Sequence, residues 1–118
     1  EGFASSADWR RAYAEINDFV RQQTDHGAIV LKFWLAITAE EQLQRFHERK
    51  RSPFKNFKIT PDDWRNREKW NQYASATNDM LALTDTDHAP WHVIGTNDKH
   101  YARVHVLKSI VTALEKTL

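Results

Sequence analysis

The chain has 118 residues, the length of one domain, and its net charge of +1 does not by itself indicate a nucleic-acid or membrane partner. It contains no cysteine, which excludes disulfides, thiolate metal ligands and a cysteine nucleophile. The three glycines, at positions 2, 27 and 95, lie too far apart for a phosphate-binding loop of the G-x-x-x-x-G-K or G-x-G-x-x-G kind, and no apolar stretch approaches membrane-spanning length.

A first helix is predicted over residues 6–25, because apolar side chains recur every three or four residues and so share one face. Ser5 or Ser6 can cap its first turn, and Gly27 stands where a C-terminal glycine is typical. The residues expected to face inward are Trp9, Ala12, Tyr13, Ile16, Phe19 and Val20.

Two apolar runs are predicted as strands, over residues 28–37 and 91–94. The first run does not alternate with polar residues, which indicates a strand covered on both faces, as in a parallel sheet. A buried helix is the competing interpretation. The β-branched and aromatic content and the preceding Gly27 favour a strand.

A capping box begins the next predicted helix. The Thr38 hydroxyl can accept from the amide of Glu41, while the Glu41 carboxylate reaches back to the amide of Thr38. This helix is expected to run to about Lys50. Its apolar face contains only Leu43 and Phe46, so we expect it to project from the body or to pack lightly on it.

Two further helices are predicted. Ser52-Pro53 interrupts the chain, and Thr60-Pro61 then begins a helix that extends to about residue 83. Its expected inner stripe is Trp70, Tyr73, Thr77, Met80 and Leu81. Asn97 or Asp98 caps the last helix, whose expected inward residues are Val104, Leu107, Ile110, Val111 and Leu114.

The predicted order is α-β-α-α-β-α, which indicates an α/β fold with a parallel sheet. Two parallel strands do not make a stable sheet alone. We therefore expect residues 1–118 to be the C-terminal portion of one larger α/β domain. A sheet face left without its neighbouring strands predicts self-association, so a homo-oligomer is expected.

A basic cluster is the strongest candidate for chemistry. Segment 45–58 contains six basic residues and one acid, although the whole chain has a net charge of only +1. Arg45 and Arg49 share one helical face, and Lys55 and Lys58 follow the break. Guanidinium and ammonium groups bind phosphate oxygens, so the cluster can clamp a polyanion. A solvated charged face, with a Glu41 contact to either arginine, explains the same pattern equally well.

Other polar residues are weaker candidates. Lys32 interrupts the first strand and can point toward a phosphate, but a lysine that extends to a sheet edge or pairs with an acid is the favoured interpretation. The run 97–99, Asn-Asp-Lys, follows the second strand, where ligands bind in open α/β sheets, although helix capping explains it too. The six histidines lack metal-site spacing.

Several stretches together resemble one family. They are 33–37 (Phe-Trp-Leu-Ala-Ile), 40–43, Arg45-Phe46, Arg49, Pro53, Lys55, 58–60, 63–65, 67–70, Tyr73, Asp79-Met80, 89–91 and 97–99. In this order they resemble the strand-to-lid region of the family-2 polyphosphate kinases and cover nearly the whole chain. The opening Glu-Gly-Phe-Ala and the stretch 63–70 resemble the C-terminal unit of tandem polyphosphate:AMP phosphotransferases.

The resemblance implies a P-loop kinase-like domain with a helical lid over about 38–83. It also implies phosphoryl transfer between polyphosphate and AMP or ADP, with magnesium. On that pattern Arg45 and Arg49 are the catalytic lid residues. Phosphates are bound by Lys55 and Lys58 and, in supporting positions, by Lys32 and Lys99.

The family's phosphate loop and magnesium-binding aspartates lie upstream of the matched region. Magnesium ligands are therefore expected outside these residues, with no metal site among them. We expect a cytoplasmic enzyme without a nucleic-acid or membrane partner, and no kinase activity from the 118 residues alone.

Two other functions remain open at this point. One is a binding module that holds nucleic acid or another polyanion without chemistry. The other is a fragment of a P-loop nucleoside monophosphate kinase with a different substrate pair. A phosphate loop about a hundred residues before Glu1 distinguishes an enzyme from a binding module. An assay with polyphosphate against ATP as donor then separates the two kinases.

Overall fold

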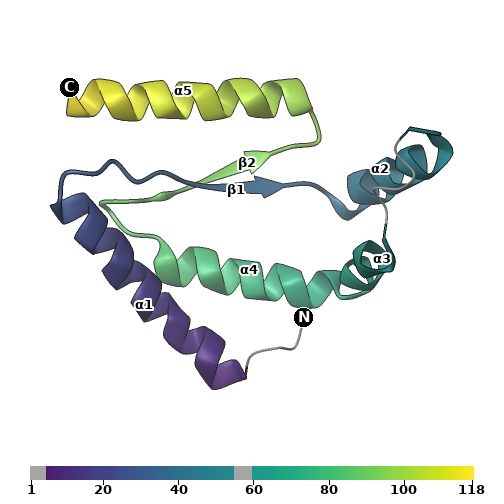
Figure 1. The fold of residues 1–118 in the computed structure, drawn as a ribbon, viewed down its shortest axis with the longest axis horizontal. Helices are drawn as coiled ribbons and strands as arrows, with labels where there is room; N and C mark the ends of the chain where they lie inside the picture. The colour runs from purple at the N-terminus through teal and green to yellow at the C-terminus, as the bar shows by residue number, and fades with distance from the viewer. Residues whose placement is uncertain (1–4, 55–59) are drawn as a thin grey trace.

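The computed structural model describes residues 5–54 and 60–118 as five helices and two strands. The elements follow one another along the chain as shown in Figure 1. They are α1 (Ser6–Asp25), β1 (Lys32–Ala36), α2 (Ala39–Arg51), α3 (Pro61–Glu68), α4 (Trp70–Thr84), β2 (Trp91–Gly95) and α5 (Lys99–Thr117).

The two strands form a parallel pair, which confirms the predicted strand direction. Lys32 lies opposite Trp91 at one end of the pair, and Ala36 lies opposite Gly95 at the other. Helix α5 covers one face of the pair, and α4, with α1 packed against it, covers the other (Figure 1). Both faces are covered, and β1 is shorter than the apolar run 28–37 from which it was predicted.

Helix α1 has the predicted bounds and caps. The Ser5 hydroxyl accepts a hydrogen bond from the amide of Asp8 at 3.2 Å. Gly27 follows the helix with a φ of 90°, a left-handed conformation that glycine adopts without strain. The predicted inner face is only partly correct, because Ile16 and Phe19 are exposed while Val20 is buried.

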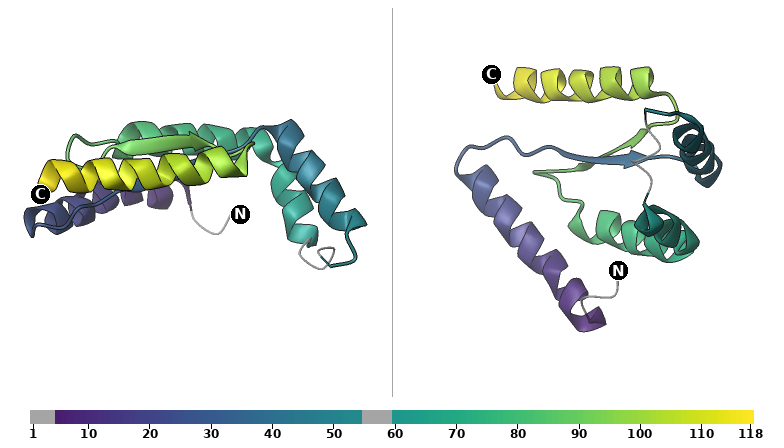
Figure 2. Two further views of the ribbon diagram at one scale, coloured as in Figure 1. Left: turned by 90° about the horizontal axis from the view of Figure 1, so that it is seen from above. Right: turned by 45° about the vertical axis from the view of Figure 1, so that its right-hand side comes forward.

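The predicted helix over residues 60–83 is two helices, and this is a correction. Lys69 separates α3 from α4 with φ −96° and ψ 20°, and its amide donates to the carbonyl of Asn66 at 3.2 Å. No proline or glycine marks the break in the sequence. The interruption allows α3 to turn away and lie beside α2, beyond the end of the strands (Figure 2).

The predicted inward face of α5 is also wrong, apart from Ile110. The side chains of Val104, Leu107, Val111 and Leu114 are exposed. Ala102 is buried instead, and the half-buried residues on its side of the helix are His105, Val106, Ser109, Ile110 and Ala113. Small side chains on that side let the helix approach the strands closely. No helix of the described residues is long and apolar enough to cross a membrane.

Candidate functional site

The carboxyl ends of the two strands lie side by side and are bonded to each other. The Thr96 amide, which follows β2, donates to the carbonyl of Ala36 at the end of β1 at 2.7 Å. Helix α2 begins a few residues after β1, and α5 begins a few residues after β2. In open α/β sheets this is the end at which ligands bind.

Asn97 joins the two segments that leave the strands. Its Oδ1 accepts from the Thr38 amide at 3.2 Å, and its Nδ2 lies 3.4 Å from the Thr38 hydroxyl. The Thr38 hydroxyl accepts from the Glu41 amide, as predicted. The second predicted hydrogen bond of the capping box, from the Thr38 amide to the Glu41 carboxylate, is wrong. The Thr38 amide donates to Asn97 Oδ1 instead. The cap of α5 is Asp98, which accepts from the Tyr101 amide at 3.1 Å.

Arg45 ties α2 to the loop after β2. Its Nε donates to Glu41 Oε1 at 3.1 Å, and both side chains are largely buried, with 16% and 24% exposed. Its Nη2 donates to the carbonyl oxygens of Thr96 and Asn97. The contact with Glu41 is one of the two that the charged-face interpretation named.

The other site residues predicted near the carboxyl end of the strands are Arg49, Lys99, Lys55 and Lys58. Arg49 lies one turn beyond Arg45 on the same face of α2 and is half-buried; within the described part of the chain no hydrogen bond or ion pair involves its side chain. Lys99 is exposed at the start of α5. Lys55 and Lys58 lie outside the described residues.

Lys32 lies at the opposite end of the strands and is not brought together with Arg45. Its Nζ donates to the carbonyl of Thr84 and lies 5.2 Å from the centre of the Trp91 ring. Burial lowers the pKa of Lys32, and the carboxylate of Asp85 partly opposes that shift. This arrangement is close to the favoured interpretation of a lysine packed at the sheet edge.

Helix α3 contacts α2 through Trp64 and Arg67. The Phe46 ring meets the Trp64 ring edge to face at 5.0 Å. Arg67 Nη1 donates to the carbonyl of Ala39 at 2.8 Å and to Gln42 Oε1 at 3.2 Å. The sequence reasoning missed the role of Arg67, and no spacing signal links it to a residue 28 positions earlier.

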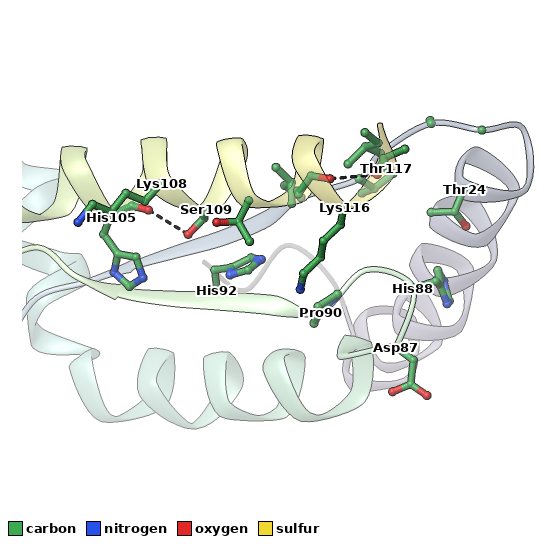
Figure 3. A pocket seen from close by; sticks show the side chains of 17 residues that line it. Thr24, Asp87, His88, Pro90, His92, His105, Lys108, Ser109, Lys116 and Thr117 are labelled. Atoms are coloured by element: carbon green, nitrogen blue, oxygen red, sulfur yellow. Dashed lines mark hydrogen bonds between the residues drawn. The ribbon is translucent and has the colours of Figure 1, made fainter.

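A cavity of about 720 Å³ lies at the other end of the molecule, between α5 and the chain that leads into the strands. His105 and Lys116 point from α5 toward β2, and His92 and Pro90 line the opposite wall (Figure 3). No group of three or more histidine, aspartate or glutamate side chains in residues 5–54 and 60–118 is arranged to hold a metal ion.

The comparisons with known proteins agree with this architecture. The family described as Polyphosphate kinase 2 (PPK2) matches residues 1–118. The chain belongs to the polyphosphate kinase 2 family. It is 59% identical over 116 residues to a polyphosphate:AMP phosphotransferase of Pseudomonas syringae, which covers 98% of the chain and 23% of that relative. It is 33% identical to a GDP-polyphosphate phosphotransferase of Pseudomonas aeruginosa, over 97% of the chain and 32% of that relative.

Solved structures of the family have the same fold. A putative polyphosphate kinase 2 from Pseudomonas aeruginosa matches with a TM-score of 0.94 and 52% identity, over 98% of the chain and 25% of that protein. Polyphosphate kinase 2 from Arthrobacter aurescens matches with a TM-score of 0.93 and 36% identity, over 98% of the chain and 41% of that protein. The chain therefore spans about a quarter of the length of the first relatives that it matches.

Proposed function

We propose that these 118 residues form the lid and the C-terminal part of a phosphotransferase that moves a phosphoryl group between polyphosphate and a nucleotide, AMP or ADP. One observation carries the proposal. In a chain of this family, helix α2 extends from the carboxyl end of a parallel strand pair, where α/β folds bind ligands, and its last turn contains Arg49, Lys50 and Arg51. Phosphoryl transfer depends on positioning and charge neutralisation, which a basic lid over 38–83 supplies.

Arg49 is the residue we assign to direct phosphate contact. It lies one helical turn beyond Arg45 on the same face, about 6 Å further along α2. Within the described residues no hydrogen bond or ion pair involves its guanidinium, and we propose that its donors bind phosphate oxygens. Lys55, Lys58 and Lys99 are proposed as further cationic groups around the same phosphates.

Arg45 has a different part in the same site. Its donors are engaged by Glu41 and by the carbonyls of Thr96 and Asn97. We assign it to holding α2 against the loop after β2, which fixes the direction of the face that Arg49 shares. Nη1 of Arg45 makes none of these bonds and can donate to a phosphate from that fixed position.

The resemblance implies magnesium, but the described residues offer no ligand set for it. We therefore propose that the magnesium ligands and the phosphate-binding loop belong to a longer parent protein. We also propose that this parent protein is cytoplasmic. The 118-residue chain alone then has no polyphosphate-dependent kinase activity. Formation of ADP from AMP and polyphosphate by the purified chain contradicts this.

The binding role of α2 is tested by titrating the purified chain with polyphosphate of defined length in a calorimeter. Arg49→Gln should weaken binding about tenfold, because it removes a charge-assisted contact worth about 1.4 kcal/mol. Arg51→Gln is the matched control. This substitution removes the same charge from the other face of α2, where Arg51 lines a hollow with His47 and Arg67. It should change the affinity for polyphosphate less than threefold.

Two results contradict the proposal. Equal weakening by both substitutions indicates diffuse attraction between charges, and no binding by the unaltered chain removes the lid role. A single-stranded oligonucleotide of equal charge is the competitor for the alternative function. Displacement of polyphosphate by that oligonucleotide at equal concentration favours a general polyanion-binding module.

A further inference from the structure

The chain enters α2 and leaves α3 at neighbouring points, and one side chain joins them. Ala39 is the first residue of α2, and Arg67 is the residue before the last in α3. Arg67 Nη1 donates to the carbonyl of Ala39 at 2.8 Å. The two helices lie beside each other beyond the end of the strands (Figure 2), so this bond closes the pair at its base.

Arg67 holds the first turn of α2 at two points. The same Nη1 donates to Gln42 Oε1 at 3.2 Å, and Ala39 and Gln42 are three residues apart on one face of the helix. Further along α2, Phe46 packs on Trp64. A single contact leaves two helices free to rotate about it. A second contact at another height fixes their crossing direction as well as their spacing.

The position of the Arg67 charge indicates a directional role. A cation beside the N-terminus of a helix is electrostatically unfavourable, because that end carries partial positive charge. Glu40 and Glu41 in the first turn of α2 offset the cost. Within residues 5–54 and 60–118, no carboxylate forms an ion pair with Arg67. Its partners there are neutral oxygens, and such hydrogen bonds depend on direction.

We propose that Arg67 is a positioning residue of the lid. By joining the base of α3 to the first turn of α2, it fixes the direction of the α2 face from which Arg49 binds phosphate. Arg45 holds the same helix against the loop after β2, so α2 is fixed both to the strands and to α3. The inference rests on the proposed function, because phosphate binding by Arg49 is assigned there.

Hydrogen exchange of the purified chain without ligand tests the contact itself. Arg67→Gln should raise exchange about fivefold in residues 42–46 and 64–68, because each segment loses the support of the other. Arg65→Gln is the matched control. It removes the same charge from the same helix, where Arg65 is exposed and pairs with Asp62, and should change exchange less than about twofold. Unchanged exchange in α1 shows that both variants are folded.

Calorimetric titration with polyphosphate of defined length separates positioning from direct contact. Arg67→Gln should weaken binding about fivefold, and Arg49→Gln about tenfold. The variant with both changes should also weaken binding about tenfold, because a residue that acts through Arg49 has no further effect once Arg49 is removed. A loss of about fiftyfold in the double variant means that the two arginines contact polyphosphate independently, and it overturns the positioning role.

Gln42→Met is a milder variant that changes no charge. It removes one acceptor of Arg67 and should raise exchange in the same two segments about twofold. If Arg67→Gln exchanges like the unaltered chain, the contact between the helices is disproved and the proposed function is unaffected. If the unaltered chain does not bind polyphosphate although exchange responds as expected, the proposed function and the positioning role both fail, and the contact alone stands.

Discussion

The two ends of the strand pair are built differently. At the carboxyl end, Asn97 and Arg45 join α2 to the loop after β2 by hydrogen bonds between residues more than 50 positions apart. At the amino end, contacts on the α4 face centre on the buried Thr84, which accepts from Lys32 and Trp91. On the α5 face of that end lies the cavity of about 720 Å³.

The carboxyl end fixes the orientation of α2 by hydrogen bonds, whereas the amino end contains an open cavity. The polar contacts at the carboxyl end orient a charged helix, which a ligand-binding role requires. The amino end has the larger cavity, yet Lys32 turns away from it toward Thr84 and Trp91. Cavity size alone points to the amino end, whereas the residues proposed to bind phosphate lie at the carboxyl end.

The largest expected effect is a difference in the free energy of unfolding between variants of Arg45 and Arg49. Arg45→Met should lower the free energy of unfolding by about 3 kcal/mol, since it leaves the largely buried Glu41 carboxylate without its partner. Arg49→Met should lower it by less than about 0.5 kcal/mol. Urea unfolding followed by circular dichroism measures both. Equal losses would mean that Arg45 is not the residue that ties α2 to the β2 loop.

A smaller effect tests the contact between the two segments that leave the strands. Asn97→Ala removes the acceptor of the Thr38 amide and should cost about 1 kcal/mol of unfolding free energy. Asn71→Ala, on the exposed face of α4, is the control and should change stability by less than about 0.5 kcal/mol. A loss no larger than that of the control would show that the Asn97 contact does not hold this end.

The smallest effect concerns Lys32 at the amino end. Its pKa is lowered in the folded chain, so folded Lys32 releases its proton before unfolded Lys32 does. Its contribution to stability therefore rises with pH between the lowered pKa and 10.5, and is lowest below that interval. Urea unfolding of the original chain and of Lys32→Met between pH 8 and about pH 11 should show this rise only in the original. Parallel curves would contradict the burial of the ammonium group.

Local signals predicted most of the fold. Residues 6–25 carry both a helical period and two caps, and the helix was found with those bounds. The parallel strands followed from an apolar run without alternation. The break at Lys69 was missed because α3 turns there to pack Trp64 on Phe46, a tertiary contact with no local breaker. The face of α5 was misassigned because the helix has two apolar stripes, and the one with small residues lies against the strands.

The sequence indicated which residues to consider for the candidate site, but not the contacts that they make. The charge run and the family resemblance placed Arg45 and Arg49 on the helix after β1, where α2 lies. The sequence could not show that Asn97 replaces Glu41 at the Thr38 amide, because these residues are 59 positions apart. It also could not separate the tying role of Arg45 from the phosphate-binding role proposed for Arg49, since both share one helical face.

Hydrogen exchange with and without polyphosphate tests the central claim most directly, because it reads both ends of the strand pair in one experiment. The account predicts slower exchange in α2 and in residues 96–99, with no change in residues 105–117 beside the cavity. Protection confined to residues 105–117, with α2 unchanged, would place the polyanion at the amino end and contradict the lid assignment.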